Sequence, residues 1–276
     1  MPPNMTANPY AHSHEVMADG SVVFQCSRDL AVNPWLALAP HHPVVVQTQS
    51  YWTAVGGSIA LQGIEATKWT ALTWTDWELG DGVGGHAVRG VYRNATLEGE
   101  HAGQLGYSIE LVNQRGAVIV TIRGKGVVFR NRNFEQWREG AKQKARKAGM
   151  PGGFAYADKA ALALSNGERV LVAPFEPACG YVEALVDDTN GFPPGNPMIG
   201  GSGDHVNSTH LHELARQALF LIKRRTDIDT SGTMSLNRYV ELGAPVRLHI
   251  EDQADNAITF EVAQMEKPCA QINLRW

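Results

Sequence analysis

The sequence has few cysteines and no long apolar run. Cys26, Cys179 and Cys269 are odd in number and lie far apart, so we expect reduced thiols instead of a disulfide framework. No apolar run is long enough to cross a bilayer, and the N-terminus lacks a basic, apolar, small-residue leader. These absences predict a cytoplasmic protein that makes no membrane contact.

A basic excess is also missing. The formal net charge is -4 at pH 7 and the isoelectric point is near 6.2. Domains that bind nucleic acid usually carry an overall or local excess of Lys and Arg, so nucleic acid is not expected as a partner. What the chain does have is 276 residues, 43% of them hydrophobic, which can build the core of one large domain or of two ordinary ones.

The most informative stretch follows a glycine-rich loop and predicts an amphipathic helix. Glu213, Arg216 and Phe220 project from the side opposite its apolar stripe, and the phenylalanine beside two charges indicates that this side is covered as well. A covered carboxylate needs a partner or a chemical task. The alternative is an ordinary surface pair between residues three apart. The apolar stripe consists of Leu211, Leu214, Ala215, Ala218, Leu219 and Ile222.

Two motifs in this half of the chain resemble a known family. The first reads Asp-His-Val from residue 204 and Leu-x-Glu-x-x-Arg-Gln-Ala from residue 211; the second reads Arg-Tyr-Val-Glu-Leu from residue 238 and Ala-Pro-Val from residue 244. In this order they are similar to the second half of the A-factor biosynthesis hotdog family. The resemblance implies an α+β double hotdog, in which each of two tandem units wraps an antiparallel sheet around a long central helix. The two units of such a chain pair with each other as a pseudo-dimer, so we expect either a monomer or a homodimer.

A second helix motif is expected in the first half of a double hotdog. Residues 41–54 align with the family's first-half pattern, but Thr48 stands where the family has Glu, and Tyr51 and Trp52 stand where it has Arg-Gln. On this alignment the first unit has lost its functional side chains. The alternative is a strand over residues 44–52, because three consecutive valines favour one.

The predicted organisation is a flexible N-terminal arm over residues 1–19, an N-terminal unit over 20–150 and a C-terminal unit over 151–276. A basic helix that ends before Gly149 and Pro151 marks the join between the units. Around it we expect the following elements: a hairpin of strands 105–112 and 117–123, a short strand at 127–130, the helix at 133–148, strands at 169–174 and 180–186, and strands after 236 with a hairpin at 252–256.

The resemblance also implies a reaction: transfer of a β-ketoacyl group from coenzyme A or an acyl carrier protein to the hydroxyl of dihydroxyacetone phosphate. In it Glu213 acts as the general base, Arg216 holds Glu213 ionised or binds a phosphate, and His205 protonates or orients the carbonyl. Backbone amides at the start of the helix hold the oxyanion. No cofactor is expected beyond the thioester substrate. The remaining substrate-binding candidates are Gly203, Asp204, Asn207 and Gln217, of which Asn207 also suits a helix cap.

Several alternatives remain open. Asn207-Ser208 replaces the family's Pro-Gly, and His205-Val206-Asn207 matches thioesterases, so hydrolysis is the main enzymatic alternative. A dehydratase needs a histidine where this chain has Asn196 or Gly203. A non-catalytic acyl-binding module is the third alternative, because the first unit lacks its acid.

Two further features of the sequence concern ligands. The basic stretches 138–147 and 223–225 are either solvated or a docking surface for an acidic carrier protein or coenzyme A phosphates. His210 and His212 point about 200 degrees apart on a helix and cannot share one ion, so no metal is predicted.

Overall fold

The computed structural model consists of two compact units, residues 1–129 and residues 130–276. Among the described residues, no helix is both long and apolar enough to cross a membrane. The structure describes residues 10–63, 70–128, 134–149, 153–165, 167–187, 190 and 205–276.

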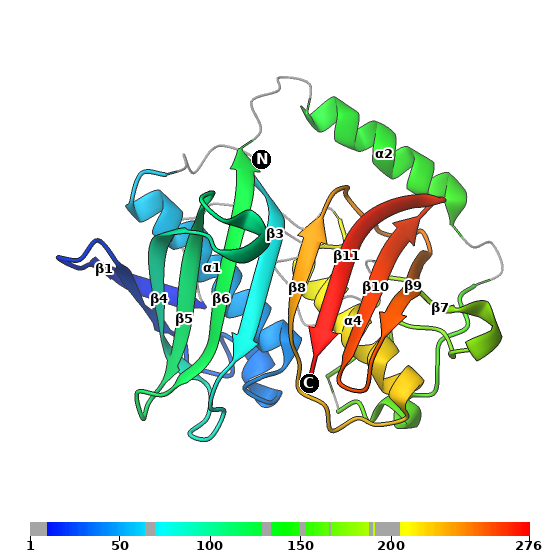
Figure 1. Cartoon of the computed structure of the whole chain (residues 1–276), viewed down its shortest axis with the longest axis horizontal. Coiled ribbons are helices and arrows are strands. Elements are labelled where there is room, and N and C mark those ends of the chain that lie inside the picture. The colour runs from blue at the N-terminus through cyan, green and yellow to red at the C-terminus, as the bar shows by residue number, and fades with distance from the viewer. Residues whose placement is uncertain are drawn as a thin grey trace. The chain divides into compact units, whose positions relative to one another are not determined.

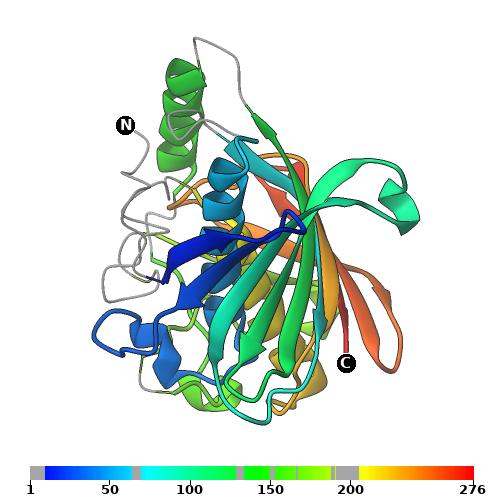
Figure 2. The ribbon, with the colours of Figure 1, turned by 90° about the vertical axis from the view of Figure 1, so that its left-hand side faces the viewer.

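In the first unit a single long helix, α1, lies along one face of an antiparallel sheet with the strand order β1-β2-β4-β5-β6-β3 (Figures 1 and 2). Two 3-10 turns, η1 and η2, complete the unit. The elements are β1 Ala11–Val16, β2 Val22–Cys26, η1 Pro34–Ala37, α1 Pro43–Ala60, β3 Thr70–Leu79, β4 Ala87–Thr96, η2 Gly99–His101, β5 Leu105–Asn113 and β6 Val118–Val128.

The α1 segment is helical despite its run of valines, as the alignment predicted and contrary to the strand alternative. His42 caps it by accepting from the Val44 amide, and Pro43 occupies the first turn, where its missing N–H costs nothing. A Cβ on Gly57 would lie 2.2 Å from the Tyr92 ring, so the glycine lets helix and sheet approach closely. Burial of the valines in this interface outweighs their strand propensity.

In the second unit the helix α4 lies along an antiparallel sheet with the strand order β8-β11-β10-β9-β7 (Figure 1). The predicted apolar stripe of α4 is buried, apart from the half-buried Ile222, and it shares the core with Phe260, Ile272 and Leu274. The elements are α2 Phe134–Ala148, η3 Lys159–Leu162, η4 Pro177–Cys179, β7 Tyr181–Ala184, α4 Ser208–Lys223, β8 Ser231–Leu236, β9 Val246–Gln253, β10 Ala257–Gln264 and β11 Lys267–Arg275.

Three details of the prediction are wrong. Residues 11–16 are not part of a flexible arm, because they form β1 and pair with β2. Val127 and Val128 do not start a separate strand, since β6 runs unbroken to Val128; residues 129 and 130 lie outside the described residues. Residues 169–174 do not form a strand either; in this segment only Val172 makes an isolated bridge, to Ala184.

The boundary between the units also differs from the prediction. The division falls between residues 129 and 130, before α2, whereas the sequence suggested residue 150. A buried ion pair joins α2 to the rest of the second unit: Arg138 donates through both terminal nitrogens to the carboxylate of Glu241, and both side chains are at most 4% exposed. This pair fastens α2 to the second unit.

Candidate active site

The site begins with the cap of α4. Asn207 precedes the helix, and its side-chain oxygen accepts from the amides of Thr209 and His210, 3.0 and 3.3 Å away. The Asn207 amide in turn donates to the His210 ring, which completes a capping box. Asn207 is therefore a helix cap. The cap already engages two of the amides that the sequence suggested for an oxyanion site.

Glu213 lies six residues beyond the cap, about 9 Å along the helix axis, and is 1% exposed. Arg216 donates to both its oxygens, from Nε at 2.8 Å and from Nη2 at 2.7 Å, and Gln217 Nε2 donates to Oε1 at 2.8 Å. The face of α4 opposite the apolar stripe is thus covered, as predicted, and the surface-pair alternative is excluded. The covering includes Phe220, which is buried and lies 4.9 Å below the Arg216 guanidinium.

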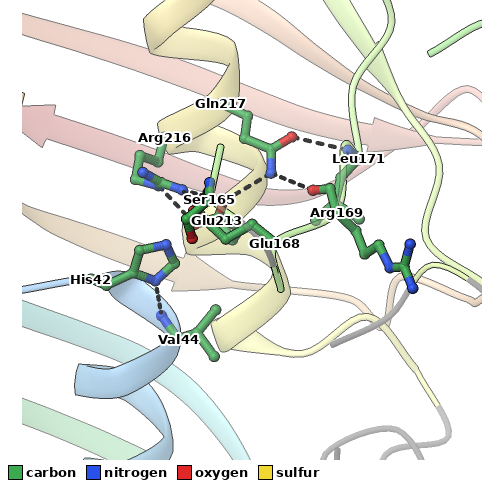
Figure 3. A network of polar contacts seen from close by, with 9 residues as sticks. All are labelled: His42, Val44, Ser165, Glu168, Arg169, Leu171, Glu213, Arg216 and Gln217. Atoms are coloured by element: carbon green, nitrogen blue, oxygen red, sulfur yellow. Dashed lines mark hydrogen bonds and ion pairs between the residues drawn. The ribbon is translucent and has the colours of Figure 1, made fainter. Parts of the chain in front are cut away.

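A second carboxylate joins this network from a loop 48 residues away. Glu168 accepts from Arg216 Nη2 at 2.6 Å through one oxygen and from Ser165 through the other, as Figure 3 shows. Burial lowers the pKa of Arg216, but the two carboxylates together raise it by more. The pKa therefore lies above its ordinary value. Two carboxylates therefore share one permanently charged guanidinium.

Gln217 ties the same loop to α4. Its side-chain oxygen accepts from the Leu171 amide and its nitrogen donates to the Arg169 carbonyl, each at 2.9 Å (Figure 3). Gln217 was predicted as a substrate-binding residue. In the structure its side-chain amide bonds to the loop backbone and to Glu213.

His205 belongs to a different cluster from Glu213. Its ring meets Tyr239 edge to face at 4.6 Å, and the Arg138 guanidinium lies 4.3 Å from the centre of the same tyrosine ring. The adjacent residues Val206 and Val240 are joined by a backbone bridge. The second sequence motif therefore lies beside the residues that open the first one. Of the other candidates, Gly203 and Asp204, like the loop residue Asn196, lie outside the described residues.

The His210 ring belongs to the cap of α4. Complete burial, and next the charge of His205, lower its pKa to about 3. Its ring is therefore neutral and serves the cap.

Comparisons with known proteins support the fold. No protein-family model matches the chain, and no curated protein does either, so the resemblance to the A-factor family stays a prediction. Solved structures do match. The dehydratase domain of a mycocerosic acid synthase-like polyketide synthase aligns with a TM-score of 0.53 at 12% identity, covering 99% of this chain and 98% of that one.

Two other dehydratase domains are similar. The dehydratase domain of RzxB from Pseudomonas fluorescens has a TM-score of 0.51 at 14% identity and covers 98% of both chains. A bifunctional dehydratase-cyclase domain in ambruticin biosynthesis has a TM-score of 0.50 at 15% identity, covering 98% of this chain and 96% of that one. The chain has the predicted α+β double hotdog fold, in which each unit is an antiparallel sheet with one long central helix.

Proposed function

We propose that this protein is an enzyme acting on acyl thioesters, and that it transfers the acyl group from coenzyme A or a carrier protein to a hydroxyl acceptor. The observation that carries the proposal is the buried Glu213, held on the central helix of the second unit by Arg216 and Gln217. The central helix α1 of the first unit contains no charged side chain. Acid–base chemistry at a central helix therefore falls to α4.

The network suits a general base. The acceptor hydroxyl gives its proton to Glu213 as its oxygen attacks the thioester carbonyl; the C–S bond then breaks, and the departing sulfur takes the proton back. When Glu213 is protonated, Arg216 keeps Glu168 as its partner. The cation is never left buried without a counter-charge, which keeps the proton transfer reversible.

His205 is assigned to the carbonyl oxygen. It is half-buried at the entry of α4, and Tyr239 holds its ring orientation from one side. Because the Asn207 cap occupies the amides of Thr209 and His210, a side-chain donor is needed to stabilise the developing oxyanion. His205 would supply that donor from its ring nitrogen.

The test is product analysis by mass spectrometry after incubation with β-ketoacyl, β-hydroxyacyl and simple acyl thioesters, with and without dihydroxyacetone phosphate. We expect an ester only when the acceptor is present. Glu213→Gln should lower the rate by about 10²-fold or more, whereas the exposed Glu176→Gln should match the wild type.

Other products would contradict acyl transfer and indicate a different function. Free acid without acceptor means a thioesterase in which water takes the place of the hydroxyl. An enoyl product from the β-hydroxyacyl thioester means a dehydratase, and a retained but unchanged thioester means an acyl-binding module. Full activity of Glu213→Gln on any substrate would remove Glu213 from the mechanism.

A further inference from the structure

Helix α2 presents a basic face to solvent in a protein whose net charge is -4. At 100 degrees per residue, Trp137, Lys144 and Lys147 share one side of the helix, and the buried Arg138 and Ala145 share the other. Both lysines are exposed and the indole is 55% exposed. A large exposed aromatic ring on the same side of the helix as two exposed lysines differs from an ordinary solvated helix face.

The positive charge of this face is only partly offset. Glu139 lies 3.4 Å from Arg146, and both side chains are about half exposed or more, so this pair screens Arg146. In the described part of the chain no ion pair involves Lys144 or Lys147. The face therefore carries a local positive potential against an acidic background, which attracts and orients an acidic partner.

Contacts of Trp137 and Arg138 hold the helix against the rest of the second unit. Arg138 enters the buried pair with Glu241 and stacks on Tyr239, and the Trp137 ring meets the same tyrosine at 5.9 Å. Tyr239 in turn contacts His205. Figure 1 shows α2 at the margin of this unit. Tyr239 therefore connects a partner bound at Trp137 with His205 at the start of α4.

We propose that Trp137, Lys144 and Lys147 form a docking surface for an acidic acyl carrier protein that delivers the thioester on its phosphopantetheine arm. The proposal rests on the proposed function. Trp137 and Lys147 are ten positions apart on the helix, which is about 15 Å along its axis. The phosphates of coenzyme A are all carried on one nucleotide and cover less than that length, whereas the acidic face of a protein helix matches it. The exposed indole supplies the apolar contact that interfaces of this kind use.

The experiment measures binding separately from turnover. A fluorescently labelled, acidic fatty-acid acyl carrier protein carrying a free phosphopantetheine arm is titrated with the full-length protein at low and at moderate salt. Wild type and Glu213→Gln should bind equally, because docking does not need the base. The double variant Lys144→Glu/Lys147→Glu should weaken binding at least tenfold, and Lys144→Gln/Lys147→Gln should weaken it by less. Added salt should weaken the wild-type complex.

The matched control is Lys159→Glu/Lys267→Glu, which makes the same charge change at two exposed lysines of the same unit and should stay within twofold of wild type. Equal weakening by both double variants would overturn the proposal, because net charge alone would then explain it. So would absence of saturable binding by the wild type. Competition by free coenzyme A that is equally sensitive to the α2 variants would also overturn it, in favour of a nucleotide phosphate site. The proposed function fails by a different readout, the product analysis with Glu213→Gln.

Discussion

Arg216 donates to both oxygens of Glu213 across one turn of α4, at 2.8 and 2.7 Å, and the Nη2 that makes the shorter of these bonds also reaches Glu168 at 2.6 Å. The Arg216 side chain is 13% exposed and that of Glu213 only 1%. Two carboxylates inside the second unit therefore share the positive charge of one guanidinium.

Arg216→Met should destabilise the protein strongly, because it leaves two carboxylates in a buried site without the cation between them. Removing one partner of a buried pair typically costs about 3–5 kcal/mol. The measurement is the midpoint of urea unfolding. Arg225→Met breaks the exposed pair with Asp227 and should leave the midpoint unchanged. Equal midpoints for the two variants would show that the Arg216 network adds nothing to stability.

Much of this network could be predicted from the sequence. Helical spacing placed Glu213 and Arg216 on one face, and Phe220 indicated that this face is covered. The partner Glu168 could not be predicted, because it lies in a loop without periodicity, 48 residues from Arg216. Gln217, a polar residue at helical spacing from Glu213, indicates only that α4 has a further polar partner, and that partner is the backbone of Arg169 and Leu171.

The same glutamine explains a wrong prediction. Residues 169–174 have strand-like composition, but Gln217 satisfies the Leu171 amide and the Arg169 carbonyl that a neighbouring strand would otherwise bond. The strand β1 was missed for another reason. Only Ala11 of its residues is buried, and Ser13 has a φ of 51 degrees within an irregular pairing, so no alternating pattern is visible in the sequence.

Arg138→Met should release α2 from the second unit. The substitution leaves the buried Glu241 without its bidentate partner, at a cost of about 3–5 kcal/mol. Trypsin should then cut faster at Lys144 and Lys147, which gel electrophoresis and mass spectrometry of the fragments detect. Arg138→Met/Glu241→Leu removes both charges and should recover much of the lost stability. A cleavage rate unchanged in Arg138→Met would show that other contacts hold α2.

Two helical glycines should respond oppositely to alanine. At Gly57 a Cβ would lie 2.2 Å from the Tyr92 ring, so Gly57→Ala forces α1 away from the sheet and should cost about 1–3 kcal/mol. At Gly140 a Cβ meets nothing within 4 Å, so Gly140→Ala should stabilise α2 by about 0.5–1 kcal/mol through helix propensity. Thermal unfolding followed by circular dichroism checks both. The close approach at Gly57 is contradicted if its variant is as stable as wild type.

His210 should make the folded state sensitive to acid. Burial lowers the pKa of its ring to about 3 in the folded protein, from about 6.5 in the unfolded chain. Between these values the unfolded state binds a proton that the folded state excludes, so stability is complete above pH 6.5 and falls as the pH drops towards 3. The slope from this one group is about 1.4 kcal/mol per pH unit.

His210→Gln isolates this contribution, because glutamine at the same position of a capping box can still accept from the Asn207 amide. Urea unfolding at pH 7.5, 6.5 and 5.5 should show that the free energy of unfolding falls more with decreasing pH for wild type than for His210→Gln. The control His12→Gln, at an exposed histidine, should follow the wild type. Parallel curves for wild type and His210→Gln would mean that the ring is protonated without cost. That result would contradict the conclusion that the His210 ring is neutral inside the cap.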